Sequence, residues 1–203
     1  MARPDTACLI VASGRGVRMG GPKALLLWTD GAPLAVSHVR MRHEVRQVVV
    51  VARAAVATRL RPWLPTARVI ASSAPGSWGP AGSIAAAVRA GAFARERWVL
   101  ITPVDLVPTR VETVAALLEA ADRGVEAVRP LCDGRGGHPV LVRAEVLVQA
   151  YLVSGTPPPL RDVLRAIGAG CVQVPVDDPD IRADLDTPEA YRARTGHGPR
   201  FAR

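Results

Sequence analysis

Residues 6–23 read Thr6-Ala-Cys-Leu-Ile-Val-Ala-Ser-Gly-Arg-Gly-Val-Arg-Met-Gly-Gly-Pro-Lys23, and this stretch decides the fold class more than any other. Its first half is a short, unbroken apolar run, which predicts a strand buried on both faces. Its second half contains Gly14, Gly16, Gly20 and Gly21 and therefore predicts a loop. In a parallel α/β sheet, a loop that follows a buried strand lies at the edge where ligands bind.

The rest of the chain repeats this alternation of buried strands with helices. Apolar runs predict strands at 47–52, 68–71, 98–101, 127–131, 171–174 and 181–185, and helical periodicity predicts helices at 33–42, 54–61, 82–94, 144–151 and 160–167. Another helix is expected behind Thr109, which forms a capping-box pattern with Glu112, and a last one is expected to begin at Pro188. This order predicts an α/β fold with a mostly parallel sheet that is covered on both faces.

Length and composition limit the architecture to one domain. The chain has 203 residues, of which 49% are hydrophobic and 22% are charged, as in globular proteins. We expect a single domain over residues 1–194 and a flexible tail over 195–203, which lacks periodicity. No apolar run approaches the roughly 20 residues that span a bilayer, and no signal peptide is recognisable. The 3 cysteines are scattered, so we expect a reduced, cytoplasmic protein without a membrane partner.

The charge indicates an anionic partner. The formal net charge is +8, but the basic residues are spread along the chain and form no block, so nucleic acid is an unsupported partner. A phosphorylated small molecule fits this charge as well. Of the 26 basic residues only Lys23 is a lysine, and it lies in the glycine-rich loop. An ammonium group can reach into a tight turn as a compact charge, which a planar guanidinium cannot.

The glycine-rich loop has the composition of a phosphate-binding turn. Gly14, Gly16 and Gly20 allow backbone N–H groups to approach an anion, and Arg18 and Lys23 supply positive charge. The spacing matches neither the P-loop nor the dinucleotide-binding fingerprint. The alternative is a flexible turn with two solvated cations.

Acidic residues follow two of the expected strands. Asp105 comes after the strand at 98–101, and Asp184 and Asp186 end the run at 181–185. Such carboxylates can hold Mg²⁺ against substrate phosphates, although an aspartate after a strand can also simply form a turn. Glycine amides, a lysine and two carboxylates together suit phosphoryl or nucleotidyl transfer. For His138, in a glycine-rich setting, a structural role and a role at the edge of the substrate remain open.

These residues resemble those of the nucleotidyltransferase family of the molybdenum cofactor guanylyl- and cytidylyltransferases. The run from Leu9 to Leu27 is similar to the family signature, and Gly79-Pro-Ala-Gly-Ser83 is similar to its base-binding segment. Pro103-Val-Asp105, Gly137-His-Pro-Val140 and Asp184-Leu-Asp-Thr-Pro-Glu189 resemble three further family motifs in the family's order. The resemblance implies a Rossmann-like three-layer sandwich and the transfer of an NMP group from an NTP to a phosphate monoester, with release of pyrophosphate.

The resemblance also implies roles for individual residues. Lys23, Arg18 and Asp105 would be catalytic, Asp105 and Asp186 would hold Mg²⁺, and His138 and Asp184 would face the acceptor. The nucleotide would be bound by Ala12, Ser13, Gly14, Gly16, Arg18, Gly20, Lys23, Pro80, Ala81 and Gly82. The expected partners are thus an NTP and a small phosphorylated acceptor, molybdopterin above all.

The nucleotide base stays open between GTP and CTP. The family carries Gly with guanine and Ala with cytosine at the position of Ser13, and serine fits neither. Two other functions also remain open. One is a sugar-phosphate nucleotidyltransferase of the same fold, and the other is a nucleotide-binding module without catalysis.

Overall fold

The computed structural model of the chain describes residues 3–42, 44–121, 124–152 and 155–202, in which strands alternate with helices. The strands are β1 (Arg3–Ala12), β2 (Val45–Arg53), β3 (Arg68–Ser72), β4 (Trp98–Pro103), β5 (Ala127–Cys132), β6 (Arg135–Gly136), β7 (Val140–Arg143) and β8 (Cys171–Pro175). The α-helices are α1 (Leu34–Arg40), α2 (Ala54–Leu60), α3 (Gly79–Arg89), α4 (Val111–Ala120), α5 (Ala144–Tyr151), α6 (Leu160–Ile167) and α7 (Pro188–Thr195).

The described strands form one eight-stranded, mostly parallel sheet. Its neighbour order is β3-β2-β1-β4-β7-β5-β6, and β8 pairs with β5. β1 pairs in parallel with β2 and β4, whereas β7 runs antiparallel between β4 and β5. The chain passes from β1 to β2 and β3 on one side and then crosses to β4 on the other. This crossing makes the carboxyl ends of β1 and β4 the topological switch point, where open α/β sheets bind their ligands.

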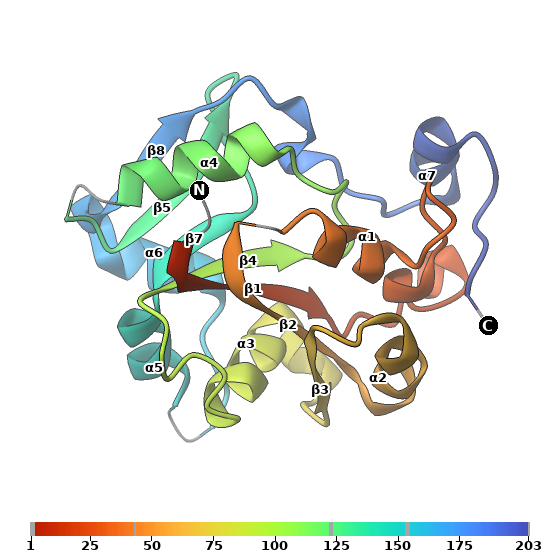
Figure 1. Cartoon of the computed structure of the whole chain (residues 1–203), viewed down its shortest axis with the longest axis horizontal. Coiled ribbons are helices and arrows are strands. Elements are labelled where there is room, and N and C mark those ends of the chain that lie inside the picture. Colours follow the sequence, from red (N-terminus) through yellow and green to blue (C-terminus); the bar gives the residue numbers. More distant parts are fainter. Residues whose placement is uncertain (1–2, 43, 122–123, 153–154, 203) are drawn as a thin grey trace.

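Helices cover both faces of this sheet, which confirms the predicted three-layer α/β fold (Figure 1). Side chains of successive strand residues point to opposite faces. In β1, Leu9 packs with residues of α3 and α5, and Ile10 packs with residues of α1 and α4. Both side chains are fully buried. The strand reads as an unbroken apolar run because both of its faces lie in a core.

A third, smaller core connects the loops that follow β1 and β4 with the C-terminal part of the chain. It is made of Met19, Leu26, Leu34, Val107, Leu185 and Tyr191. The hydroxyl of Tyr191, in α7, also donates a hydrogen bond to the backbone oxygen of Leu27. This cluster therefore holds the loop after β1, the loop after β4 and α7 against one another.

The N-terminus of α4 differs from the predicted capping box. The N-cap position is Arg110, one residue later than expected, and no side chain caps the helix. Thr109 is instead buried. The helix is anchored at its third residue, where the hydroxyl of Thr113 donates to the buried carboxylate of Asp178 at 2.7 Å.

The sequence predicts a flexible tail over residues 195–203. The part of this segment that the structure describes is instead held by hydrogen bonds. The backbone N–H of Leu27 donates to the oxygen of Arg200, and the N–H of Ala202 donates to the oxygen of Leu25, both at 2.8 Å. Phe201 forms a bridge with Leu26, and its ring lies against Gly21, where an added Cβ would be 2.9 Å from the ring. The C-terminal segment therefore packs against the loop that carries Lys23 and is hydrogen-bonded to it.

Replacing Phe201 by alanine is expected to lower the free energy of unfolding by about 1–3 kcal/mol, since the half-buried ring joins two of the cores. Chemical denaturation measures this change. Arg200→Ala is the matched control, because the contact of Arg200 with Leu27 is made by its backbone oxygen, and its effect should stay within about 0.5 kcal/mol. Equal stability of Phe201→Ala and the parent would show that the C-terminal segment does not stabilise the loop after β1.

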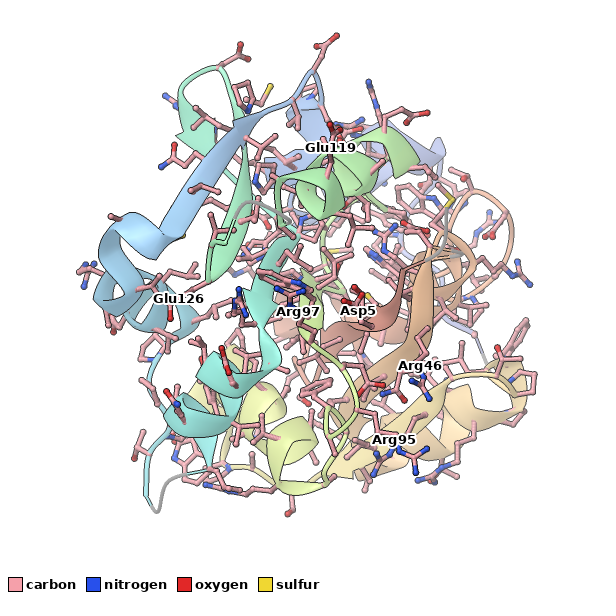
Figure 2. The ribbon with its side chains drawn as sticks, turned by 60° about the vertical axis from the view of Figure 1, so that its left-hand side comes forward. Asp5, Arg46, Arg95, Arg97, Glu119 and Glu126 are labelled. Carbon is pink, nitrogen blue, oxygen red and sulfur yellow. The ribbon has the colours of Figure 1, made fainter. Side chains whose placement is uncertain are left out.

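The amino-terminal edge of the sheet carries mixed charge. Figure 2 shows Asp5, Arg46 and Arg97 around the amino ends of the central strands, with Arg95 nearby. The backbone N–H of Arg97 donates to the oxygen of Asp5 at 2.7 Å, which ties the start of β4 to the start of β1. The candidate site lies at the opposite edge, where the parallel strands β1, β3 and β4 end and polar loops follow them.

Candidate functional site

The loop after β1 folds into a tight turn that requires glycine at one position above all. Gly16 has a φ of 61°, in the left-handed region, and a Cβ added to it would lie 1.9 Å from the backbone oxygen of Gly21. Its own oxygen accepts hydrogen bonds from the N–H groups of Met19 at 2.9 Å and Gly21 at 3.2 Å. Two 3₁₀ turns, Val17–Met19 and Lys23–Leu25, complete the loop. The loop therefore returns to the strand end with Lys23 beside it.

Lys23 connects the three segments of the candidate site. Its ammonium nitrogen lies 3.1 Å from an Oδ atom of Asp105 and donates a shorter hydrogen bond to Asp186. The side chain of Lys23 is only 14% exposed, whereas those of Asp105 and Asp186 are 36% and 48% exposed. Arg18 adds a second, more distant cation, 3.9 Å from the other oxygen of Asp186.

The charges of this cluster stabilise one another. Burial lowers the pKa of Lys23, but the hydrogen bonds and charges of Asp186 and Asp105 outweigh burial, so that the pKa is raised overall. The hydrogen bond from Lys23 lowers the pKa of Asp186. The lysine is therefore cationic and Asp186 anionic at neutral pH.

The two aspartates meet because the segments that carry them pair through their backbones. The N–H of Leu185 donates to the oxygen of Asp105 at 2.7 Å, and the N–H of Val107 donates to the oxygen of Ala183 at 3.1 Å. The predicted strand at 181–185 is therefore wrong. The segment forms a 3₁₀ turn at Pro179–Arg182 and then one isolated bridge from Asp184 to Leu106.

A cavity of about 720 Å³ opens above this cluster, at the topological switch point. Of the residues expected to bind a nucleotide or metal, the following line it: Ser13, Gly14, Gly16, Arg18, Lys23, Pro80, Asp105 and Asp186. Ala12, Gly20 and Gly82 do not line this cavity. The structure thus brings most of the expected residues to one place, while their roles stay predictions.

A second cavity of about 600 Å³ adjoins the first, since Val11, Pro80 and Pro103 line both. Ala81 and His138 line the second cavity. His138 is held there by its backbone, whose N–H donates to the oxygen of Ile181 at 2.8 Å. Burial lowers the pKa of His138, so the ring is neutral. Asp184, also expected on the acceptor side, is exposed and lines neither cavity.

Several lining residues are absent from the predicted site residues, although Ser72 and Ser83 lie at the ends of a loop expected at this edge. Arg53 and Ser72 end β2 and β3, and the rule that ligands bind at the carboxyl ends of strands could have found them. Ser83, in α3, donates a hydrogen bond of 2.8 Å to Ser13. Arg129, in the second cavity, had no signal in the sequence, because it lies within the strand β5 and not after it.

Possible metal ligands at the site are the carboxylates of Asp105 and Asp186. The described residues contain no group of three or more His, Cys, Asp and Glu side chains arranged to hold a metal ion. Asp105 and Asp186 do converge on one cation, the ammonium of Lys23. Two carboxylates fit the way in which proteins hold Mg²⁺, with substrate phosphates and waters completing the coordination.

The geometry of the site defines a class of protein. Backbone amides, an ammonium and two carboxylates lie together at the switch point of a parallel sheet. This is the arrangement of α/β proteins that bind a phosphorylated ligand.

The chain belongs to the family of MobA-like NTP transferase domains, whose model matches residues 8–169. The molybdenum cofactor guanylyltransferase of Pseudomonas paraeruginosa is 30% identical over 195 residues, which is 93% of this chain and 93% of that protein. The family resemblance of the sequence is thereby confirmed.

Two solved structures share the fold. The manganese complex of Rv0371c from Mycobacterium tuberculosis H37Rv has a TM-score of 0.75 at 18% identity, covering 97% of this chain and 100% of that one. The molybdopterin-guanine dinucleotide biosynthesis protein A of Archaeoglobus fulgidus has a TM-score of 0.67 at 19% identity, covering 94% of this chain and 97% of that one.

Within the described part of the chain, no helix is both long and apolar enough to span a bilayer.

Proposed function

We propose that the protein transfers a guanylyl group from GTP to the phosphate of molybdopterin and releases pyrophosphate. The observation that carries this proposal is the ammonium of Lys23, held between Asp105 and Asp186 beside the glycine turn. In the reaction, an oxygen of the acceptor phosphate forms a bond to the α-phosphorus. The bond from that phosphorus to the bridging oxygen breaks, and pyrophosphate leaves with the electron pair.

The protein's task in such a reaction is positioning and charge neutralisation. The phosphate nucleophile is already ionised at neutral pH, so no protein base is needed. Lys23 and Arg18 bind the triphosphate, and backbone amides of the glycine turn lie beside it. Lys23 exchanges its carboxylate partners for phosphate oxygens when the nucleotide enters, which leaves the two aspartates free.

Asp105 and Asp186 would hold a divalent cation, which we propose to be Mg²⁺. When bound, the ion supplies charge neutralisation for the triphosphate and the leaving pyrophosphate. The manganese complex of the related M. tuberculosis protein supports a divalent ion at such a fold. The hard carboxylate oxygens favour magnesium or manganese over softer metals.

GTP is the proposed nucleotide because the similar proteins are named guanylyltransferases. The segment expected to contact the base contains Ser13, whose hydroxyl accepts a hydrogen bond from Ser83 and lies 3.4 Å from the oxygen of Val51. Serine adds only a small, internally bonded hydroxyl to this wall of the cavity. Serine at position 13 is therefore compatible with a purine base that binds close to the backbone of this segment.

The test is an assay of pyrophosphate release with each of the four NTPs, with Mg²⁺ or Mn²⁺, and with molybdopterin or hexose phosphates as acceptors. We expect release with GTP and molybdopterin and none with hexose phosphates. The variant Asp105→Asn serves as the inactive control. Release with hexose phosphates alone would instead establish a sugar-phosphate nucleotidyltransferase, and NTP binding without turnover would establish a binding module.

A further inference from the structure

The second cavity has a mainly apolar wall with one unusual polar group. Apolar side chains that line it include Ile84, Ile101, Val140, Leu160 and Leu164. The cations that line it, among the described residues, are Arg129 and Arg161. Such a wall suits a flat, weakly polar ring system, and a cation within it suits an anionic group carried by that ring.

Arg129 is a part-buried cation without a counter-charge. It lies in β5, and no hydrogen bond or ion pair joins its guanidinium to another residue that the structure describes. Its Nε atom is buried and has no hydrogen-bond partner. A part-buried guanidinium with a buried, unpaired N–H is costly to leave without a partner, so its presence in the wall of a cavity indicates an anion that binds there.

Gly136 provides the space that the guanidinium of Arg129 occupies. A Cβ added at Gly136 would lie 1.5 Å from Nη2 and 2.2 Å from Cζ of Arg129. Gly136 belongs to β6, which pairs with β5 through Leu131. The hairpin therefore holds the side chain of Arg129 flat against a residue that has no side chain of its own.

Arg161 differs from Arg129 in its exposure and in having a carboxylate partner. Its side chain is 80% exposed, and its Nε lies 3.7 Å from a carboxylate oxygen of Asp162. The neutral ring of His138 lies near Arg129 but adds hydrogen-bonding capacity without charge. Arg129 is thus the cation of this cavity that is available to an anion.

We propose that Arg129 binds the phosphate monoester of the acceptor and that the apolar wall binds the ring system that carries it. This inference rests on the proposed function and adds the acceptor-specificity residue to it. A phosphate monoester carries a charge of about −1.5 to −2 at neutral pH and must approach a triphosphate that is itself anionic. Lys23 and Arg18 face the triphosphate, so a separate cation on the acceptor side is required to offset the repulsion.

The experiment measures equilibrium binding of molybdopterin, kept anaerobic, and of its dephosphorylated form by fluorescence. Arg129→Met is expected to raise the Kd of molybdopterin about 10- to 100-fold, the range for a lost charged hydrogen bond. It should leave the Kd of the dephosphorylated form and of GTP within about threefold. Gly136→Ala should weaken molybdopterin binding in the same direction, because the new Cβ displaces the guanidinium.

Arg135→Met is the matched control, since Arg135 lies in the same hairpin, is exposed and lines neither cavity. Thermal unfolding adds a readout that separates binding from structure. Removal of a part-buried cation that has no counter-charge should leave the melting temperature of Arg129→Met equal to or above that of the parent. A structural role predicts a lower one.

Equal molybdopterin affinity of Arg129→Met and the parent would overturn this inference, and so would an equal loss of affinity for the dephosphorylated form. The proposed function fails in a different way. A parent protein whose binding depends on the acceptor phosphate, but which releases no pyrophosphate from any NTP, keeps the role of Arg129 and loses the transferase.

Discussion

Replacement of Lys23 by alanine is expected to lower kcat/KM for pyrophosphate release by about 100- to 1,000-fold, the usual cost of removing one preorganised charged donor. Lys23 is the single lysine of the chain, and its ammonium lies where the loops after β1 and β4 meet. No second ammonium can replace it. The loss should appear in kcat as well as in GTP binding, because charge on the leaving pyrophosphate grows in the transition state.

Two further variants separate catalysis from a purely structural ion pair. Lys23→Arg retains the charge but presents a planar guanidinium in a tight turn, so we expect it to recover only a minor part of the activity. Arg40→Ala removes an exposed ion pair with Asp30 outside the cavity and should change kcat/KM by less than about threefold. Activity of Lys23→Ala within threefold of the parent, at unchanged folding, would remove Lys23 from the mechanism.

Most of the sheet could be predicted from local patterns, because strands buried on both faces are unbroken apolar runs. β1 and β4 are examples, and the helices between strands follow from periodicity and from proline at their starts. The segment 181–185 misled the prediction for a physical reason. Its backbone pairs at one bridge with Leu106, which is distant in sequence, and Pro179 starts a 3₁₀ turn there.

The C-terminal segment could not be predicted for the same reason. Residues 195–203 have no periodicity, and the described ones are held by contacts of Phe201 and Ala202 with Gly21 and Leu25. Such contacts depend on the folded loop after β1, so no local pattern records them. A short segment without periodicity is therefore weak evidence for flexibility.

Most residues of the first cavity could be predicted, but of the second cavity the sequence predicted Ala81 and His138 and not Arg129. Lys23 and Asp105 lie in the loops that follow β1 and β4, so the rule for parallel sheets places both at one edge. Arg129 lies inside a strand and owes its position to the missing side chain of Gly136, a contact between two strands of a hairpin. The second cavity depends on such contacts across the sheet, which only the folded structure supplies.

Alanine substitutions at three glycines of the loop after β1 should separate backbone strain from steric overlap. Gly14 has no atom within 4 Å of an added Cβ, so Gly14→Ala should keep the free energy of unfolding within about 0.5 kcal/mol. Gly20 has equally open space but a φ of 81°, so its alanine variant should lose about 1–2 kcal/mol. Both variants leave the course of the turn unchanged.

Gly16→Ala is expected to lose the most, about 2–4 kcal/mol, and to weaken GTP binding more than either of the others. It combines a left-handed φ with a Cβ that would lie 1.9 Å from the oxygen of Gly21 and 3.2 Å from the backbone nitrogen of Lys23. Because both contacts are backbone, the turn must open and carry Lys23 away from Asp105. Chemical denaturation and calorimetric GTP titration measure the two effects. If Gly16→Ala matched Gly20→Ala in both, the loss would come from the left-handed backbone alone, and the closed turn would not be what positions the lysine.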